Sequence, residues 1–140
     1  MPLDLERRER FRFYHLNSDE REKLIHLIKS FLDKRSEIIL SIIYGSILHS
    51  SYFRDIDIAI YISDKVDYLN YKFELERAIS DEIGYPVDVK VLNYAPPWFI
   101  KRVIEKGRVV IEKKPLFLVK LYKKALDEYS YFRGLENYNY

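Results

Sequence analysis

The chain contains the run Ile38-Ile39-Leu40-Ser41-Ile42-Ile43-Tyr44-Gly45-Ser46, and after eight intervening residues it continues as Asp55-Ile56-Asp57-Ile58-Ala59-Ile60. The first run is rich in β-branched residues and stops at a glycine, a pattern typical of a strand buried on both faces. In the second run aspartates alternate with isoleucines, so that acidic and apolar side chains point to opposite faces of a strand. The first run therefore predicts a central strand, and the second a strand with one acidic edge.

Helical and extended patterns interleave around these two strands. Alternating residues predict a third strand at 87–92, and a shorter apolar run predicts a fourth at 108–111. Capping residues and apolar periods of three and four predict helices at 19–34, 66–83, 96–106 and 115–133. Residues 11–16 are expected to form a short strand, and the residues after 133 a loose tail. This order predicts an α/β (α+β) fold with a small mixed β-sheet flanked by helices.

Length and cysteine content narrow the class of protein. The 140 residues predict a single domain, 1–140, with an N-terminal arm or short strand at 1–16 and a C-terminal helix and tail at 115–140. The chain has no cysteine, which excludes thiolate zinc sites, cysteine nucleophiles and a disulfide scaffold. No run approaches about 18 uncharged apolar residues. A cytoplasmic protein without a membrane span is therefore expected.

Charge and composition bear on the ligand and the source. Lys and Arg number 24 and Asp and Glu 22, which leaves a net charge of +2 and disfavours nucleic acid as the main ligand. The chain lacks Gln and Thr and is rich in Ile, Lys, Glu, Arg and Tyr, a composition typical of a thermophile. The aromatic residues of segment 115–140 predict a contact with a protein partner or a second copy, as in a homodimer.

The two aspartates and the glycine-serine pair predict a site for metal and phosphate. Residues two apart on a strand lie about 6.7 Å apart with side chains on one face, so Asp55 and Asp57 can share a Mg²⁺ ion at about 2.1 Å. Without a cation the two carboxylates repel each other and a pKa rises. Gly45 allows the backbone to approach a ligand closely, and Ser46 adds a hydroxyl beside backbone N–H groups that can hold phosphate oxygens.

The specificity of this pattern comes from its context. Ten aspartates in one chain give roughly 0.7 Asp-x-Asp pairs by chance, whereas a Gly-Ser pair followed at this spacing by Asp-x-Asp is expected in roughly one chain in a hundred. Haloacid dehalogenase-type phosphatases and some glycosyltransferases also use Asp-x-Asp, but there a buried strand leads directly into the first aspartate. Here the strand follows the pair, so those classes fit poorly.

Tyr44-Gly45-Ser46, Asp55-Ile56-Asp57 and the later Val87-Asp88-Val89 resemble the minimal nucleotidyltransferases of the DNA polymerase beta-like superfamily. The similarity extends from about His15 to Gly107. It implies that Gly45 and Ser46 hold the nucleoside triphosphate, that Asp55, Asp57 and Asp88 hold two Mg²⁺ ions, and that Asp88 assists the attacking hydroxyl. Many members are antitoxins encoded beside a HEPN-domain RNase toxin, and some adenylylate tyrosines of that toxin.

The resemblance predicts a Mg²⁺-dependent transfer of a nucleoside monophosphate, AMP from ATP, to a hydroxyl such as a tyrosine of a HEPN-type partner. The loop from the Gly-Ser pair to Asp55 is shorter than in many relatives, and Ser50 or Ser51 stands where a glycine is common. Two alternatives therefore stay open. One is a noncatalytic antitoxin that occludes its partner, and the other is a mononucleotide-binding regulator.

Several other side chains have two interpretations. His49 could touch phosphate or face solvent, and Arg54 could bind phosphate or balance the acidic pair. A group of cations after position 100 could steer a triphosphate or RNA, although a charged helix face is more often solvated: Lys101, Arg102, Lys106 and Arg108.

Overall fold

The computed structural model describes residues 12–63 and 66–138. A four-stranded sheet in the order β5-β4-β2-β6 forms its centre, and the strands in that order are Val87–Val91, Ile56–Ile62, Ile38–Tyr44 and Arg108–Glu112. Strand β2 pairs antiparallel with β4 and β6, whereas β4 pairs parallel with β5. The predicted mixed sheet flanked by helices is therefore confirmed, and β2 is a central strand as expected.

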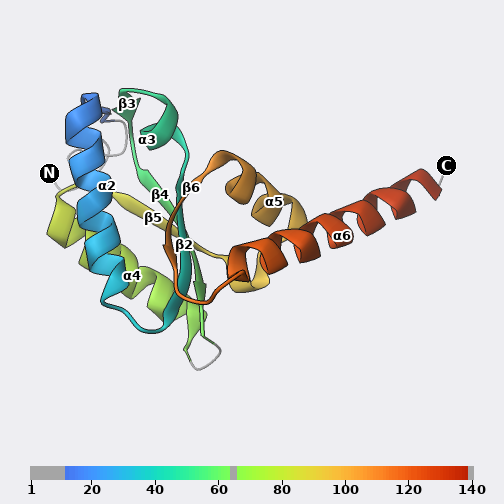
Figure 1. The fold of residues 1–140 in the computed structure, drawn as a ribbon. Coiled ribbons are helices and arrows are strands. Elements are labelled where there is room, and N and C mark those ends of the chain that lie inside the picture. The colour runs from blue at the N-terminus through green and yellow to red at the C-terminus, as the bar shows by residue number, and fades with distance from the viewer. Residues whose placement is uncertain (1–11, 64–65, 139–140) are drawn as a thin grey trace, which may run out of the picture.

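Two pairs of helices cover the two faces of the sheet (Figure 1). One face carries α2 (Ser18–Asp33) and α4 (Tyr68–Ile83), and the other carries α5 (Pro97–Lys106) and α6 (Phe117–Tyr138). Because strand side chains alternate, each face has its own core. Six isoleucines of β2 and β4 belong to the larger core, beneath α2 and α4. Leu40, Ile42 and Ala59 belong to the smaller one, beneath α5 and α6.

The helix ends follow the capping residues in the sequence. Asn17 and Glu20 form a capping box at the start of α2, and the Asp67 side chain accepts hydrogen bonds at the start of α4. Gly84 ends α4 in the left-handed conformation with φ +80°. Helix α4 begins at Tyr68 rather than at 66 because Asp67 is its cap. Helix α5 ends at Lys106, as predicted, and Gly107 follows it directly.

Three short elements lie where loops were expected. Ser46–His49 form the one-turn helix α3, and Leu92–Tyr94 form the 3₁₀ helix η1, which takes Leu92 out of the predicted third strand. Tyr52–Phe53 (β3) pair with Tyr14–His15 (β1), so the predicted N-terminal strand is present but shorter. The arm 1–11 lies outside the described residues.

The predicted loose tail after residue 133 is wrong as far as the chain is described, because α6 continues to Tyr138. A single glycine such as Gly134 costs a helix only about 1 kcal/mol, and no proline interrupts the segment. The last turns of α6 extend beyond the body of the protein (Figure 1). Tyr131, Phe132 and Leu135 are exposed there, and the predicted contact with another chain stays a prediction.

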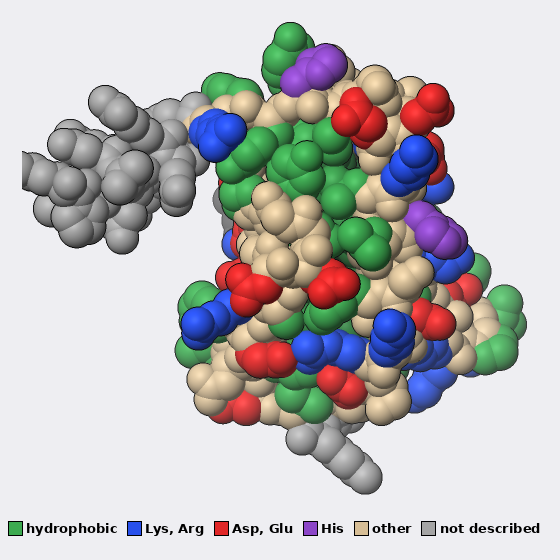
Figure 2. All heavy atoms as spheres, turned by 90° about the vertical axis from the view of Figure 1, so that its left-hand side faces the viewer, with side chains coloured by type: hydrophobic (Ala, Val, Ile, Leu, Met, Phe, Trp, Pro, Cys, Tyr) green, Lys and Arg blue, Asp and Glu red, His purple; other side chains and the backbone are tan. Residues whose placement is uncertain are grey.

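The surface over α2 and α4 carries acidic and basic side chains interspersed with apolar ones (Figure 2). This distribution agrees with the small net charge of the chain. Across the described residues, no helix has both the length and the apolar character that a membrane crossing requires.

Candidate functional site

The glycine-serine turn lies where β2 ends and α3 begins. Tyr44 is the last residue of β2, and Gly45 follows with φ +85°, a conformation that favours glycine. A Cβ atom added at Gly45 would lie 2.2 Å from Oδ2 of Asp57. The backbone therefore passes directly beside this carboxylate, and only a glycine leaves room for both. Ser46 is exposed at the start of α3.

The sheet register places acidic residues of two strands beside the end of a third, as the alternation predicted. Tyr44 pairs with Asp57, and Asp57 pairs with Asp88. Asp57 lies two residues before Ala59 and therefore points to the same face of the sheet, the face that α5 and α6 cover. The site thus lies at the carboxyl end of β2, on the α5 side.

Electrostatic repulsion acts on Asp57 in particular. Burial, followed by the nearby carboxylates of Asp88 and Asp55, raises the pKa of Asp57 to about 6, although Lys90 opposes this rise. Burial and the carboxylates of Asp57 and Asp88 also raise the pKa of Tyr44 well above its ordinary value. The site therefore concentrates negative charge that a cation could balance.

Asp55 and Asp88 differ from Asp57 in their surroundings. Asp55 is exposed and lies one residue before β4, so the predicted strand starts one residue later than expected. Asp88 lies within β5, with the Nζ atoms of Lys72 and Lys90 each 3.7 Å from one of its carboxylate oxygens. These two lysines, which the sequence did not single out, keep the Asp88 carboxylate partly neutralised.

The carboxylate oxygens suit a hard cation such as Mg²⁺, and after burial the neighbouring carboxylates of Asp88 and Asp55 contribute to the raised pKa of Asp57. Within 12–63 and 66–138, however, no three His, Cys, Asp or Glu side chains are gathered closely enough to hold one ion together. The donor types fit a metal, whereas their convergence on one point is not present. The three-carboxylate metal site stays a prediction.

A pocket of about 460 Å³ lies beside the glycine turn, and its lining comes from β2, β4, α3 and α5: Tyr44, Gly45, His49, Asp57, Phe99, Arg102, Val103 and Lys106. Its volume is within the range typical of small-molecule sites. Of the predicted residues it brings Gly45 and Asp57 together, while Ser46, Asp55 and Asp88 lie outside its lining.

Two apolar residues of this pocket, Phe99 and Val103, were missed in the sequence, whereas Arg102 and Lys106 were among the cations considered there. The rings of Tyr44 and Phe99 contact each other edge to face, with centroids 5.9 Å apart. Phe99, Arg102, Val103 and Lys106 recur at the three- and four-residue spacing of one helix face. That spacing is a signal that could have found Phe99 and Val103, once the helix was known to pack beside the glycine turn.

The raised pKa of Asp57 predicts a pH-dependent stability. The pKa of Asp57 is 3.8 for an ordinary aspartate and about 6 in the folded protein. Between pH 3.8 and 6, Asp57 is therefore ionised in the unfolded chain while it still holds its proton in the folded one. The free energy of unfolding should therefore fall as the pH rises from about 4 to about 6. Asp57→Asn removes this loss, and above pH 6 the metal-free variant should be more stable by about 1 kcal/mol, after allowance for solvent screening.

Thermal unfolding of wild type and Asp57→Asn across this pH range measures the effect. Mg²⁺ should raise the stability of wild type at pH 7 and leave the variant nearly unchanged, because a ligand stabilises only the state that binds it. If the free energies of unfolding of the two proteins change with pH in parallel, the pKa of Asp57 is not raised and the prediction is wrong.

The fold and the site together define a class of protein. A glycine turn held against a strand aspartate, with a second aspartate in register on the next strand, is the arrangement that the motif resemblance implied for nucleotidyltransferases. Residues 26–116 match the family described as Polymerase beta, Nucleotidyltransferase. The match spans more than half of the chain, and the chain belongs to this family. The predicted fold and the nucleotidyltransferase class are thereby confirmed.

Several solved structures are similar to this chain. One contains tri-AMPylated Shewanella oneidensis HEPN toxin in complex with MNT antitoxin; it is 19% identical with a TM-score of 0.66, covering 84% of this chain and 92% of that one. The structure of the toxin-antitoxin MntA-HepT is 20% identical with a TM-score of 0.62, and the match covers 84% of this chain and 90% of that one. A toxin-antitoxin structure with AMP-PNP is 21% identical with a TM-score of 0.66, and the match covers 84% of this chain and 92% of that one. No curated protein matches the chain. At these identities the likeness shows the fold.

Proposed function

We propose that this protein transfers AMP from ATP to a hydroxyl group, and that the acceptor is a tyrosine of a HEPN-type partner protein. The observation that carries the proposal is the close approach of the Gly45 backbone to Asp57 at the edge of a pocket. Two similar structures add support, since one contains an AMPylated HEPN toxin and another contains AMP-PNP. Because the proposed reaction consumes ATP and modifies an RNase, we place the protein in the cytoplasm.

The acidic residues would hold the divalent cations. Asp55 and Asp57, with Asp88 on the neighbouring strand, are the residues that we assign to Mg²⁺, because the carboxylates of Asp88 and Asp55 lie near that of Asp57 and add to the rise of its pKa. When bound, Mg²⁺ would neutralise phosphate charge and favour departure of pyrophosphate.

The turn and Asp88 would act on the substrates. Gly45 lacks a Cβ and so lets phosphate oxygens approach the backbone, and the Ser46 hydroxyl would donate a hydrogen bond to them. The acceptor oxygen then forms a bond to the α-phosphorus, while the bond from that phosphorus to the bridging oxygen breaks and pyrophosphate leaves. Asp88 would take the proton of the acceptor hydroxyl, a role that requires its ionised form.

Two observations favour the alternative of a noncatalytic antitoxin that occludes its partner. Lys72 and Lys90 flank Asp88, and the carboxylates do not converge in the described structure. A protein that has lost catalysis would keep the fold and the partner surface while lysines neutralise the former metal ligand.

Persistence of the effect on the partner separates transfer from occlusion. The partner, obtained as the copurifying protein or as the product of the adjacent gene, is incubated with this chain, Mg²⁺ and ATP, and the chain is then removed by affinity chromatography. We expect the RNase activity of the partner to stay silenced, because the modification is covalent. An ATP analogue with a methylene bridge between the α- and β-phosphates should not support this effect. Silencing that needs no ATP and ends when the chain is removed would establish occlusion.

A further inference from the structure

Four cations in and after α5 separate into two groups. The Nζ atom of Lys101 lies 2.7 Å from Glu105 Oε1, and a guanidinium nitrogen of Arg108 lies 2.7 Å from Glu22 Oε1. Arg102 and Lys106 instead line the pocket beside Gly45 and Asp57. Neither side chain has a hydrogen bond or an ion pair to another residue within the part of the chain that the structure describes. The structure thus distinguishes cations that the sequence left equivalent.

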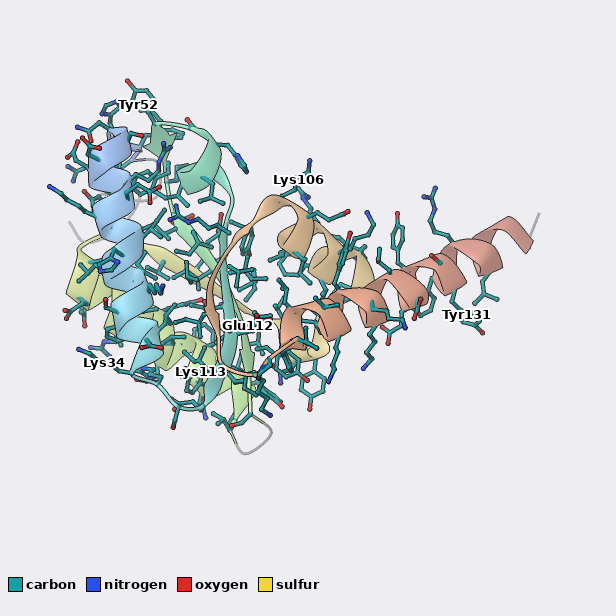
Figure 3. All side chains as sticks on the ribbon, viewed as in Figure 1. Lys34, Tyr52, Lys106, Glu112, Lys113 and Tyr131 are labelled. Carbon is teal, nitrogen blue, oxygen red and sulfur yellow. The ribbon has the colours of Figure 1, made fainter. Side chains whose placement is uncertain are left out.

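Helix α5 holds these two cations at a fixed position relative to the glycine turn. Ile100 and Val103 are buried in the core beneath the helix, and a Cβ atom added at Gly107 would lie 2.4 Å from a methyl carbon of Ile42. The end of α5 is therefore packed tightly against β2, the strand that leads to Gly45. Lys106 lies at the last turn of the helix, at the same end of the molecule as α3 (Figure 3).

The charges of the pocket suit a polyphosphate. Its lining contains one carboxylate, Asp57 of β4, two cations of α5, and His49 of α3. A basic residue such as Lys106 in the last turn of a helix also interacts favourably with the helix dipole. That interaction would be the same if Lys106 faced solvent, so it does not explain the position of Lys106 in the pocket lining. A polyphosphate bound next to the Asp57 carboxylate would need positive charges in addition to those of a metal ion. Arg102 and Lys106 supply two such charges.

We propose that Arg102 and Lys106 bind the β- and γ-phosphates of the nucleoside triphosphate, so that this pocket selects triphosphates over monophosphates. This proposal rests on the proposed function. Arg102 can donate two parallel hydrogen bonds to phosphate oxygens, and Lys106 adds a mobile point charge. The same contacts would stabilise the pyrophosphate that leaves.

Charge-removing variants of similar length test this proposal. The affinities of ATP, AMP and inorganic tripolyphosphate are measured by calorimetry with Mg²⁺ and without any acceptor protein. Arg102→Met with Lys106→Met should weaken ATP and tripolyphosphate binding by about 10- to 100-fold and AMP binding by less than about threefold. Lys101→Met, which removes a cation paired with Glu105 on the same helix, should change ATP affinity by less than about threefold. Circular dichroism checks that each variant is folded.

The outcomes separate this proposal from the proposed function. Equal losses for ATP and AMP in the double variant, or an equal loss in Lys101→Met, would overturn the assignment of the phosphates to Arg102 and Lys106. If wild type prefers ATP through these residues but modifies no partner, the phosphate site stands and the transfer proposal fails. If wild type transfers AMP and the double variant binds ATP as tightly as wild type does, the transfer stands and the phosphate site fails.

Discussion

Asp57→Asn should lower the rate of AMP transfer by about a thousandfold while the protein stays folded. The substitution keeps the shape of the side chain and removes its charge, and electrostatic groups at a transferring phosphoryl are commonly worth two to three orders of magnitude. Asp57 pairs with residues of both neighbouring strands, lies directly beside the glycine turn and lines the pocket. Single-turnover transfer to the partner protein at saturating ATP measures the effect.

A matched control separates the role of Asp57 from a general effect of losing a carboxylate. Asp81 is an exposed residue of α4 that does not line the pocket, and Asp81→Asn should leave the rate within about twofold. Since Asp57→Asn is expected to stabilise the metal-free protein above pH 6, unfolding would not account for a lost activity. A rate for Asp57→Asn within threefold of wild type would remove Asp57 from the catalytic machinery.

Gly45→Ala should abolish measurable ATP binding and lower the melting temperature. The added Cβ would lie 2.2 Å from Asp57 Oδ2, so either the turn or the carboxylate has to move. The backbone at Gly45, with φ 85° and ψ −159°, also lies in a region that essentially only glycine adopts. Thermal unfolding and calorimetric titration with ATP measure the two effects.

Gly84→Ala is the comparison variant for this prediction. Gly84 also has a positive φ of +80°, but nothing lies within 4 Å of its added Cβ. Its substitution should cost about 1 kcal/mol of stability from the left-handed conformation and leave ATP affinity unchanged. If Gly45→Ala binds ATP as wild type does, or if both variants lose affinity equally, the close approach at Gly45 has no part in nucleotide binding.

Local signals in the sequence predicted most of the fold. The apolar run of β2, the acidic alternation of β4 and the apolar period of α2 each depend on residues close together in the chain, and all three are present. The glycine turn was predictable for the same reason. The one-turn helix α3 and the continuation of α6 past Arg133 were not predicted, because a short helix and a helix end depend on weak local preferences.

The candidate site depended on contacts between distant segments. The resemblance implied that Gly45, Asp57 and Asp88 would come together. The sheet register pairs Asp57 with Asp88 and also with Tyr44, the residue before Gly45. Sequence spacing could not show that α5 packs beside this turn, and so it could not separate Arg102 from Lys101. It also could not show that a lysine of α4 reaches Asp88 across 16 positions of the chain.

The position of the label from ATP tests the central claim most directly. Two parallel reactions contain wild-type protein, Mg²⁺ and the partner, one with ATP labelled at the α-phosphate and one with ATP labelled at the γ-phosphate. Transfer of AMP breaks the bond between the α- and β-phosphates, so the α-label should appear in the partner protein and the γ-label should be released in pyrophosphate. Incorporation of the γ-label, or no incorporation of either label while the partner is fully silenced, would contradict the account.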